Sequence, residues 1–132
     1  MIFPEGCTTR GTHLLQFKKG PFASLMPVQP FVHITSSRRG NPSLGYPINI
    51  WHWSFLIMEF MWCRAEQLEM PVFAPNEYFW KHHWDGKDEK TKWLVFANAV
   101  REAMAECHGF TLSESTMDTK MELKELLWGK HK

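Results

Sequence analysis

The sequence predicts the α/β class, specifically an incomplete layered domain in which a partial sheet is flanked by helices. Segments with strand-like alternation of apolar residues are followed by segments with helix-like apolar spacing of three or four residues. This order of strands and helices is typical of layered α/β folds. At most three strands are predicted, and two of them contain proline, so the sheet is thinner than a complete domain of this class needs. The composition is globular, with 44% hydrophobic and 22% charged residues among 132.

The first predicted strand lies at the N-terminus. Its last residues are Ile2 and Phe3, and the segment PEG at residues 4–6 leads from them into a small polar cluster at residues 7–9. This pattern is typical of a strand that delivers a functional loop. Strands of this kind normally have others before them in the sheet, whereas only Met1 precedes this one. We therefore expect the sheet to be incomplete on this side.

A helical turn, a strand and a loop are predicted before residue 48. The turn is expected at residues 14–19 (LLQFKK) and is stopped by Gly20 and the proline after it. Residues 28–34 alternate in the manner of a strand, and Pro30 places that strand at a sheet edge or at its own first residues. Residues 35–47 are rich in Ser, Gly and Pro and predict a loop.

Residues 48–63 form an aromatic and apolar run, INIWHWSFLIMEFMWC. The run is shorter than the roughly 20 residues that span a bilayer, and His52 and Glu59 interrupt it. A buried core helix, an interfacial helix and a shortened span remain open. Tryptophan favours the boundary between water and lipid, which supports the interfacial interpretation.

The second half of the chain predicts a strand, a polar loop and two helices. We expect the strand at residues 66–73 and the loop at residues 76–90. Three- and four-residue apolar spacing predicts a helix over residues 90–108, including Leu94, Ala97, Val100, Met104 and Cys107, and Gly109 is expected to end it. Asp118 is the expected N-cap of a short amphipathic tail helix.

Charge is uneven along the chain, whose formal net charge is +1. Residues 1–40 contain five basic side chains and one acidic one, a net charge of +4, which suits either an anionic ligand or a solvated basic face. The small overall charge gives no support to nucleic-acid binding. Three widely spaced cysteines argue against a disulfide framework and a zinc pair, and favour a reducing environment.

Five short blocks stand in an order that resembles the glycerophospholipid acyltransferase family, and most closely its lysophosphatidylcholine acyltransferase branch. The resemblance covers residues 2–110, so we expect the C-terminal part of a phospholipid/glycerol acyltransferase domain over 1–110 and a tail with a short amphipathic helix over 111–132. The blocks are residues 3–9 (FPEGCTT), 17–22 (FKKGPF), 26–30 (MPVQP), 70–75 (MPVFAP) and 97–106 (ANAVREAMAE).

The resemblance implies transfer of a fatty acyl group from acyl-CoA, as co-substrate, to a hydroxyl of a lysophospholipid or a glycerol phosphate. It implies no further cofactor and no metal. In the family the FPEG block binds the phosphate-bearing part of the acceptor, and we expect Glu5 to hydrogen-bond backbone amides or a ligand hydroxyl and so to hold the loop. The residues expected to bind substrate are Phe3, Pro4, Glu5, Gly6, Cys7, Lys18 and Lys19.

The general base that the family uses is not found in its expected place. The family carries a His-x-x-x-x-Asp block before FPEG, and its histidine takes the proton of the acceptor hydroxyl. The one match in this chain runs from His83 to Asp88, after FPEG and in a predicted loop, and is rejected. A metal site at His82, His83 and Asp85 is rejected as well, because adjacent histidines point apart. No catalytic residue is assigned, and the chain alone is expected to be inactive.

Three function hypotheses follow from these observations. The first is an acyltransferase of phospholipid synthesis, represented by its acceptor-binding C-terminal half. The second is a non-catalytic membrane- or partner-binding module derived from that family, docking through residues 48–63. The third is a plain structural domain that is monomeric and melts cooperatively. The first two predict association with a membrane, on the cytosolic face of the endoplasmic reticulum.

Overall fold

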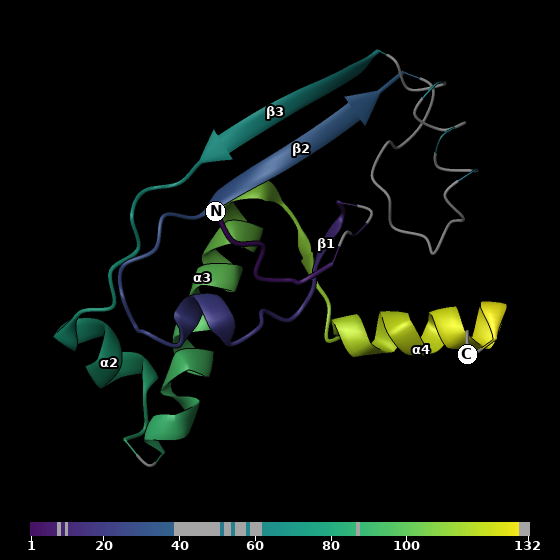
Figure 1. Ribbon diagram of the computed structural model, residues 1–132. Coiled ribbons are helices and arrows are strands. Elements are labelled where there is room, and N and C mark those ends of the chain that lie inside the picture. Colours follow the sequence, from purple (N-terminus) through teal and green to yellow (C-terminus); the bar gives the residue numbers. More distant parts are fainter. Residues whose placement is uncertain are drawn as a thin grey trace.

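The structure is a computed structural model, and it describes residues 1–38, 51, 54, 58 and 62–129, except Thr8, Arg10 and Lys87. Short strands and helices alternate in it, and one long helix occupies the middle (Figure 1). The elements in chain order are β1 (His13–Leu14), η1 (Gly20–Phe22), β2 (Phe31–Ser37), β3 (Cys63–Glu69), α2 (Glu77–His83), η2 (Glu89–Thr91), α3 (Lys92–His108), β4 (Thr111–Leu112) and α4 (Met117–Trp128).

The described strands form two separate pairs. β2 and β3 are antiparallel, and their register runs from Phe31 opposite Glu69 to Ser37 opposite Cys63. β1 and β4 are parallel, with His13 opposite Thr111. Figure 1 shows β2 and β3 as a long ribbon that extends away from α3, whereas β1 and β4 lie beside it. The protein is therefore mixed α/β, as predicted, with strands in two pairs among the described residues.

Helix α3 supplies the centre of the core. Phe96 and Ala97 are fully buried, and Val100 and Met104 continue the same face one and two turns later. Leu14, Phe17 and Phe22 from the N-terminal segment and Val32 from β2 pack in the same cluster. The helix ends at Gly109, whose φ of 68° is left-handed. The predicted helix and its stop are confirmed, although Leu94 and Cys107 lie outside the buried face.

Two N-terminal predictions are wrong. Residues 2–3 are not in a strand, and both side chains are exposed. Residues 14–19 do not form a helical turn, because Leu14 belongs to β1 and Gln16 donates its backbone N–H to the Ser115 carbonyl at 3.2 Å. Hydrogen bonds to a distant segment thus override the local helical pattern. The helical turn lies instead at η1, directly after the predicted position.

The predicted loop at residues 76–90 contains a helix. The Asn76 side chain caps α2 by accepting a hydrogen bond from the Phe79 N–H at 2.8 Å. Phe79 is buried, and its ring packs edge to face against Phe73 at a centroid distance of 5.7 Å. Phe79 is therefore buried and Trp80 packs against the core, whereas Tyr78 is mostly exposed.

The remaining elements were placed a few residues away from their actual positions. β2 begins at Phe31, directly after Pro30, whereas the predicted strand began at residue 28. β3 ends at Glu69, before Pro71, whereas the predicted strand continued to residue 73. The peptide groups of Val28 and Phe73 still form a bridge beyond these ends. The tail helix has Thr116 as its N-cap, not Asp118, which lies in its first turn.

The aromatic run at 48–63 lies largely outside the described residues. Five of its members are described, and the large apolar ones among them, Trp51, Met58 and Trp62, are 72%, 71% and 88% exposed. Among the described residues, no helix has both the length and the apolar character that a bilayer crossing requires.

Candidate functional site

The candidate site is built around a tight turn at residues 3–6, called here the N-terminal turn. Gly6 donates its backbone N–H to the Phe3 carbonyl at 3.2 Å and has a φ of 71°. The side chain of Lys18 crosses this glycine, so a Cβ there would lie 3.0 Å from Lys18 Cε. Only glycine satisfies both the left-handed backbone and the close approach of the lysine without strain.

Segment 12–18 fastens the N-terminal turn from one side. The Lys18 backbone N–H donates to the Pro4 carbonyl at 2.8 Å. The Leu15 backbone N–H donates to Glu5 Oε1 at 2.7 Å. The expectation that Glu5 hydrogen-bonds a backbone amide and holds the loop is therefore confirmed.

Segment 111–117 supports segment 12–18 from its other side. Figure 1 shows the chain after α3 returning beside β1 before it enters α4. The Gln16 side chain adds a hydrogen bond to Glu114 at 2.8 Å. The backbone bonds of this layer are Thr111 N–H to Thr12 O at 3.3 Å, Ser113 N–H to Leu14 O at 3.0 Å and Gln16 N–H to Ser115 O at 3.2 Å. These bonds cross the predicted domain boundary at residue 110, which stays a prediction.

Arg101 connects these segments from the buried face of α3. Its residue exposure is 5%, and its Nη2 donates to the Leu14 carbonyl at 3.0 Å and to the Ser113 carbonyl. Burial raises the pKa of the Glu5 carboxyl above its usual value, and the Leu15 N–H and the charge of Arg101 lower that pKa again in part. The guanidinium therefore serves both neighbouring segments and the turn.

Lys18 presents the ammonium group nearest to the turn. Its Nζ contacts Met117 Sδ at 3.2 Å, and a thioether is only a weak hydrogen-bond acceptor. The ammonium thus lies over Gly6 with most of its hydrogen-bonding capacity unused by this contact. The turn and Lys18, which the sequence assigned to one site, lie together in the structure.

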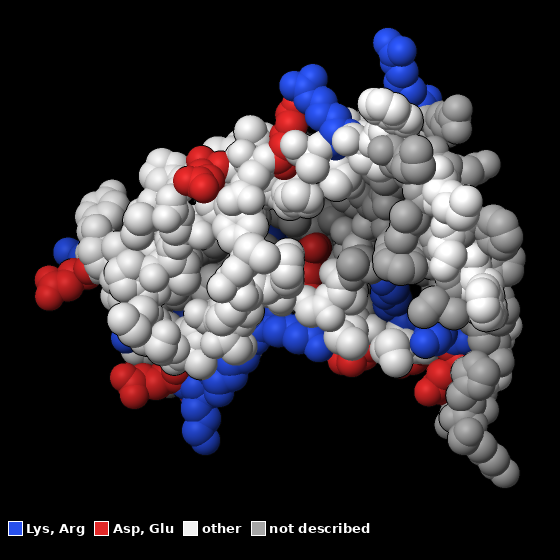
Figure 2. Space-filling model, turned by 45° about the horizontal axis from the view of Figure 1, so that its top comes forward, with Lys and Arg blue, Asp and Glu red and all other residues white. Residues whose placement is uncertain are grey.

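The other sequence-predicted site residues are less closely involved. Phe3 contributes a carbonyl to the turn and is otherwise exposed, and Lys19 is exposed where η1 begins. Cys7 is half-buried. Figure 2, with the β2–β3 side turned toward the reader, shows uncharged atoms over most of this face and both signs of charge within a central hollow.

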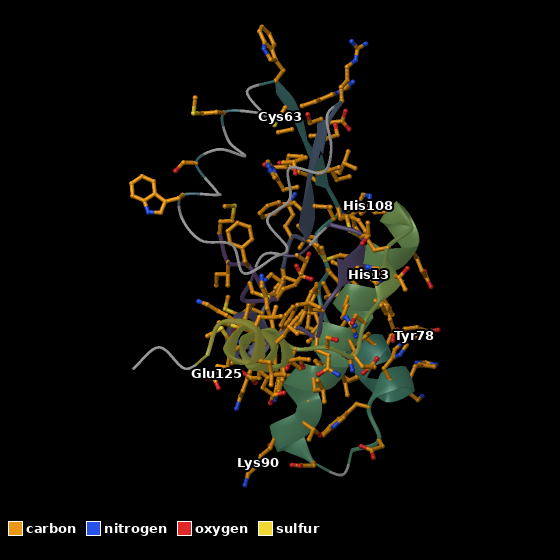
Figure 3. All side chains as sticks on the ribbon, turned by 90° about the vertical axis from the view of Figure 1, so that its right-hand side faces the viewer. His13, Cys63, Tyr78, Lys90, His108 and Glu125 are labelled. Carbon is orange, nitrogen blue, oxygen red and sulfur yellow. The ribbon has the colours of Figure 1, made fainter. Side chains whose placement is uncertain are left out.

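His82 and His83, which lie at the end of α2, form no competing site with the other described residues. The ring of His83 stacks on Phe79 at 4.9 Å, and Asp88 Oδ1 accepts the Lys90 N–H at 2.9 Å as a cap of η2. Figure 3 shows Lys90 at the start of α3 and His108 at its other end. No group of three metal-ligating side chains occurs in the part of the chain that the structure describes.

Sequence reasoning missed Arg101. Its signal was present, because an arginine surrounded at three- and four-residue spacing by Ala97, Met104 and Ala105 lies on the apolar face of its helix. A charged residue in that position indicates a buried partner on another segment.

Comparison with known proteins gives relatives of one kind. Human lysophosphatidylcholine acyltransferase 1 is 31% identical over 138 residues, covering 95% of this chain and 22% of the relative. Human lysophosphatidylcholine acyltransferase 2 is 29% identical, covering 89% of the chain and 20% of the relative. Lysophospholipid acyltransferase LPEAT1 of Arabidopsis thaliana is 30% identical, covering 91% and 27%. No protein-family model matches the chain, and no solved structure is similar to it.

The chain spans between 20% and 27% of the length of these curated relatives. The similarity, in contrast, extends over 95% of the chain itself for human lysophosphatidylcholine acyltransferase 1. With about 30% identity over 95% of its own length, this chain is related to the lysophospholipid acyltransferases.

Proposed function

We propose that the chain contributes the acceptor-binding part of an acyltransferase that moves an acyl group from acyl-CoA to a lysophospholipid or glycerol-phosphate hydroxyl. The main support for this proposal is the geometry of the N-terminal turn. Backbone N–H groups of segment 12–18 hydrogen-bond to the Pro4 carbonyl and the Glu5 carboxylate, and the Lys18 side chain lies against Gly6. A tight glycine turn beside an ammonium is suited to a phosphate, because both backbone N–H groups and cations favour an anion.

The individual roles follow from the chemistry of each group. Lys18 supplies the positive charge for the acceptor phosphate, and Gly6 lets the backbone approach that phosphate. Glu5 shapes the turn through the Leu15 N–H rather than by touching the phosphate, since two anions in contact repel. Phe3, Pro4, Cys7 and Lys19 complete the substrate-binding set, and no cofactor beyond acyl-CoA is required.

The chain alone is proposed to lack acyltransferase activity. An unactivated hydroxyl attacks a thioester slowly unless a positioned base takes its proton, and such a base typically raises the rate about 10²–10⁴-fold. The only His-x-x-x-x-Asp spacing runs from His83 to Asp88, whose side chains stack on Phe79 and cap η2. Release of CoA that depends on an added lysophospholipid would contradict this part of the proposal.

The phosphate site can be tested with a soluble, short-chain lysophosphatidate, whose binding to the chain is measured by titration calorimetry. Replacement of Lys18 by Met removes the ammonium and is expected to weaken binding about tenfold or more, the effect of one charge-assisted hydrogen bond. Lys90→Met removes a lysine of the same type from η2 and is the matched control. Equal affinity of the Lys18→Met variant and the unaltered chain would refute the assignment.

A second candidate function, docking on a membrane without catalysis, is supported by exposed apolar side chains in the 48–63 run. Trp51, Met58 and Trp62 all belong to this run and are mostly exposed. Large apolar side chains in this arrangement suit the lipid–water boundary. We propose that this run contacts the cytosolic face of the endoplasmic reticulum membrane, whether or not the chain takes part in catalysis.

Sedimentation with liposomes tests the membrane contact. The double replacement of Trp51 and Met58 by Ala is expected to lower the liposome-bound fraction severalfold, because about 0.8 kcal/mol is lost for each methylene no longer buried. Leu126→Ala, at an exposed position of α4, is the control for a lost surface leucine. An unchanged bound fraction in the double variant would count against membrane docking through this run.

A further inference from the structure

We propose that Arg101 is a positioning residue for the N-terminal turn, holding segment 12–18 and the Glu5 carboxylate where the acceptor phosphate needs them. The inference deepens the proposed function, because it takes the N-terminal turn as a ligand site. Arg101 does not itself contact the ligand, and acts through Leu14, Leu15 and Glu5.

The path from Arg101 to the turn is short and continuous. Nη2 donates to the Leu14 carbonyl at 3.0 Å, and the next N–H along the chain, that of Leu15, donates to Glu5 Oε1 at 2.7 Å. Glu5 directly precedes Gly6, the residue crossed by Lys18. The orientation of one peptide unit therefore couples the guanidinium of Arg101 to the carboxylate, and the carboxylate fixes the turn.

The same guanidinium holds the support behind segment 12–18. Nη2 also donates to the Ser113 carbonyl, and the Ser113 N–H donates to the same Leu14 carbonyl at 3.0 Å. Arg101 thus joins segments 12–18 and 111–117 at the level of Leu14. Loss of the guanidinium would release both, although the β1–β4 pair would keep its backbone hydrogen bonds.

A purely structural role predicts a different arrangement. An arginine kept only for core stability has no need to join particular segments, whereas both acceptors of Arg101 Nη2 are backbone carbonyls of segments 12–18 and 111–117. Buried charged groups often contribute little to stability compared with apolar residues of similar size. The contacts that Arg101 does make are directed at the two segments next to the turn.

The experiment compares four variants of the full chain with a matched control. Arg101→Met fills the same space without charge, and Arg101→Lys keeps the charge without the planar group. Glu5→Gln keeps an acceptor for the Leu15 N–H, and the double variant Arg101→Met/Glu5→Gln leaves no unpaired charge. Arg64→Met, at an exposed position of β3, is the control for the loss of one arginine.

Two readouts separate positioning from stability. The first is the affinity for a short-chain lysophosphatidate, by calorimetry, and the second is the hydrogen-exchange rate of the Leu15 amide, by NMR. Arg101→Met is expected to weaken binding about tenfold and to speed Leu15 exchange by a similar factor, the effect of one hydrogen bond to a charged group. Arg101→Lys is expected to recover part of both effects, and Arg64→Met to change neither.

The double variant keeps the inference testable if Arg101→Met loses its fold. In that variant the Glu5 charge is no longer unpaired, and the effects of the two single changes on Leu15 exchange are expected not to add. Unchanged exchange and affinity in Arg101→Met, additive effects in the double variant, or equal weakening by Arg64→Met would each overturn the inference. If the unaltered chain binds no lysophosphatidate, the proposed function fails, and Leu15 exchange still decides on Arg101.

Discussion

The N-terminal turn and the β2–β3 pair differ in how the rest of the molecule holds them. The turn is bound through segment 12–18 to segment 111–117 and to Arg101 of α3, so three distant parts of the chain fix it. β3, by contrast, is exposed at every one of its seven residues and is paired among the described residues with β2 alone. The turn that we propose as the phosphate site therefore lies on the side of the protein with the denser hydrogen bonding between segments.

The difference also separates two kinds of stabilisation. The turn side contains the buried apolar cluster around Phe96, together with hydrogen bonds that join segments far apart in sequence. The β2–β3 pair depends on its own ladder and on β2 residues such as Val32 that reach the cluster. Because local opening follows local contact density, we expect β3 to open more readily than segment 12–18.

The largest expected effect tests this contrast at its core. Replacement of Phe96, which is fully buried against Phe22 and Phe73, by Ala is expected to lower the free energy of unfolding by about 3–5 kcal/mol. Leu68→Ala in β3, at 39% exposure, is expected to cost about 0.5 kcal/mol or less. Urea unfolding measures both, and similar losses would show that the two regions are equally integrated.

A smaller effect isolates the contact between Lys18 and the turn. Gly6 and Gly109 both have left-handed backbones, with φ of 71° and 68°, but only Gly6 has another residue within 4 Å of the added Cβ. Alanine at either position is expected to cost about 1–2 kcal/mol in backbone strain. Only Gly6→Ala is expected to displace Lys18 and therefore to weaken lysophosphatidate binding.

Calorimetric binding of both glycine variants provides the check. The stability loss of Gly109→Ala, measured by thermal unfolding, corrects for the backbone strain that the two changes share. A Gly109→Ala variant that binds as weakly as Gly6→Ala would mean that strain alone, and not the lysine, governs the site.

Local patterns predicted the parts of the site that depend on nearby residues. Glycine and proline marked the N-terminal turn, and the spacing of Ala97, Val100 and Met104 marked α3. The hydrogen bond of Glu5 to a backbone amide was expected from the phosphate site that the family resemblance implies, because an ionised carboxylate repels a phosphate and bonds elsewhere. Each of these features is decided within a few residues of the chain.

The parts that sequence did not predict depend on distant segments. No local motif specifies the register in which segment 12–18 pairs with segment 111–117. Because this pairing takes up backbone groups of residues 14–16, the helical turn predicted at residues 14–19 does not form. The spacing of Arg101 places it on the apolar face of α3, but its partners, the Leu14 and Ser113 carbonyls, belong to distant segments that the local pattern does not identify. Helix α2 was predicted as a loop because charged residues lie among its aromatic ones, although Asn76 is a residue type that commonly caps a helix N-terminus.

The smallest expected effect is the pH dependence that Glu5 contributes. Burial, the largest influence, raises its pKa, so the folded protein holds this proton to a higher pH than the unfolded chain does. The contribution to stability is then fully present below the unfolded pKa of about 4.3 and is lost as pH rises through the folded pKa. Glu5→Gln removes that loss, because the amide oxygen still accepts the Leu15 N–H without a charge to desolvate.

Thermal unfolding of the unaltered chain and of Glu5→Gln, measured from pH 4 upward, isolates this term by difference. The advantage of the glutamine variant is expected to grow with pH across the window just above the ordinary glutamate pKa, and then to level off. The Leu15 N–H and the charge of Arg101 both favour the ionised form of this carboxyl and so lower its pKa. A growth of the difference in the opposite direction would mean that the Leu15 hydrogen bond and the Arg101 charge together outweigh the cost of burying the carboxylate. Glu102→Gln, at an exposed position of α3, corrects for the loss of one acidic side chain.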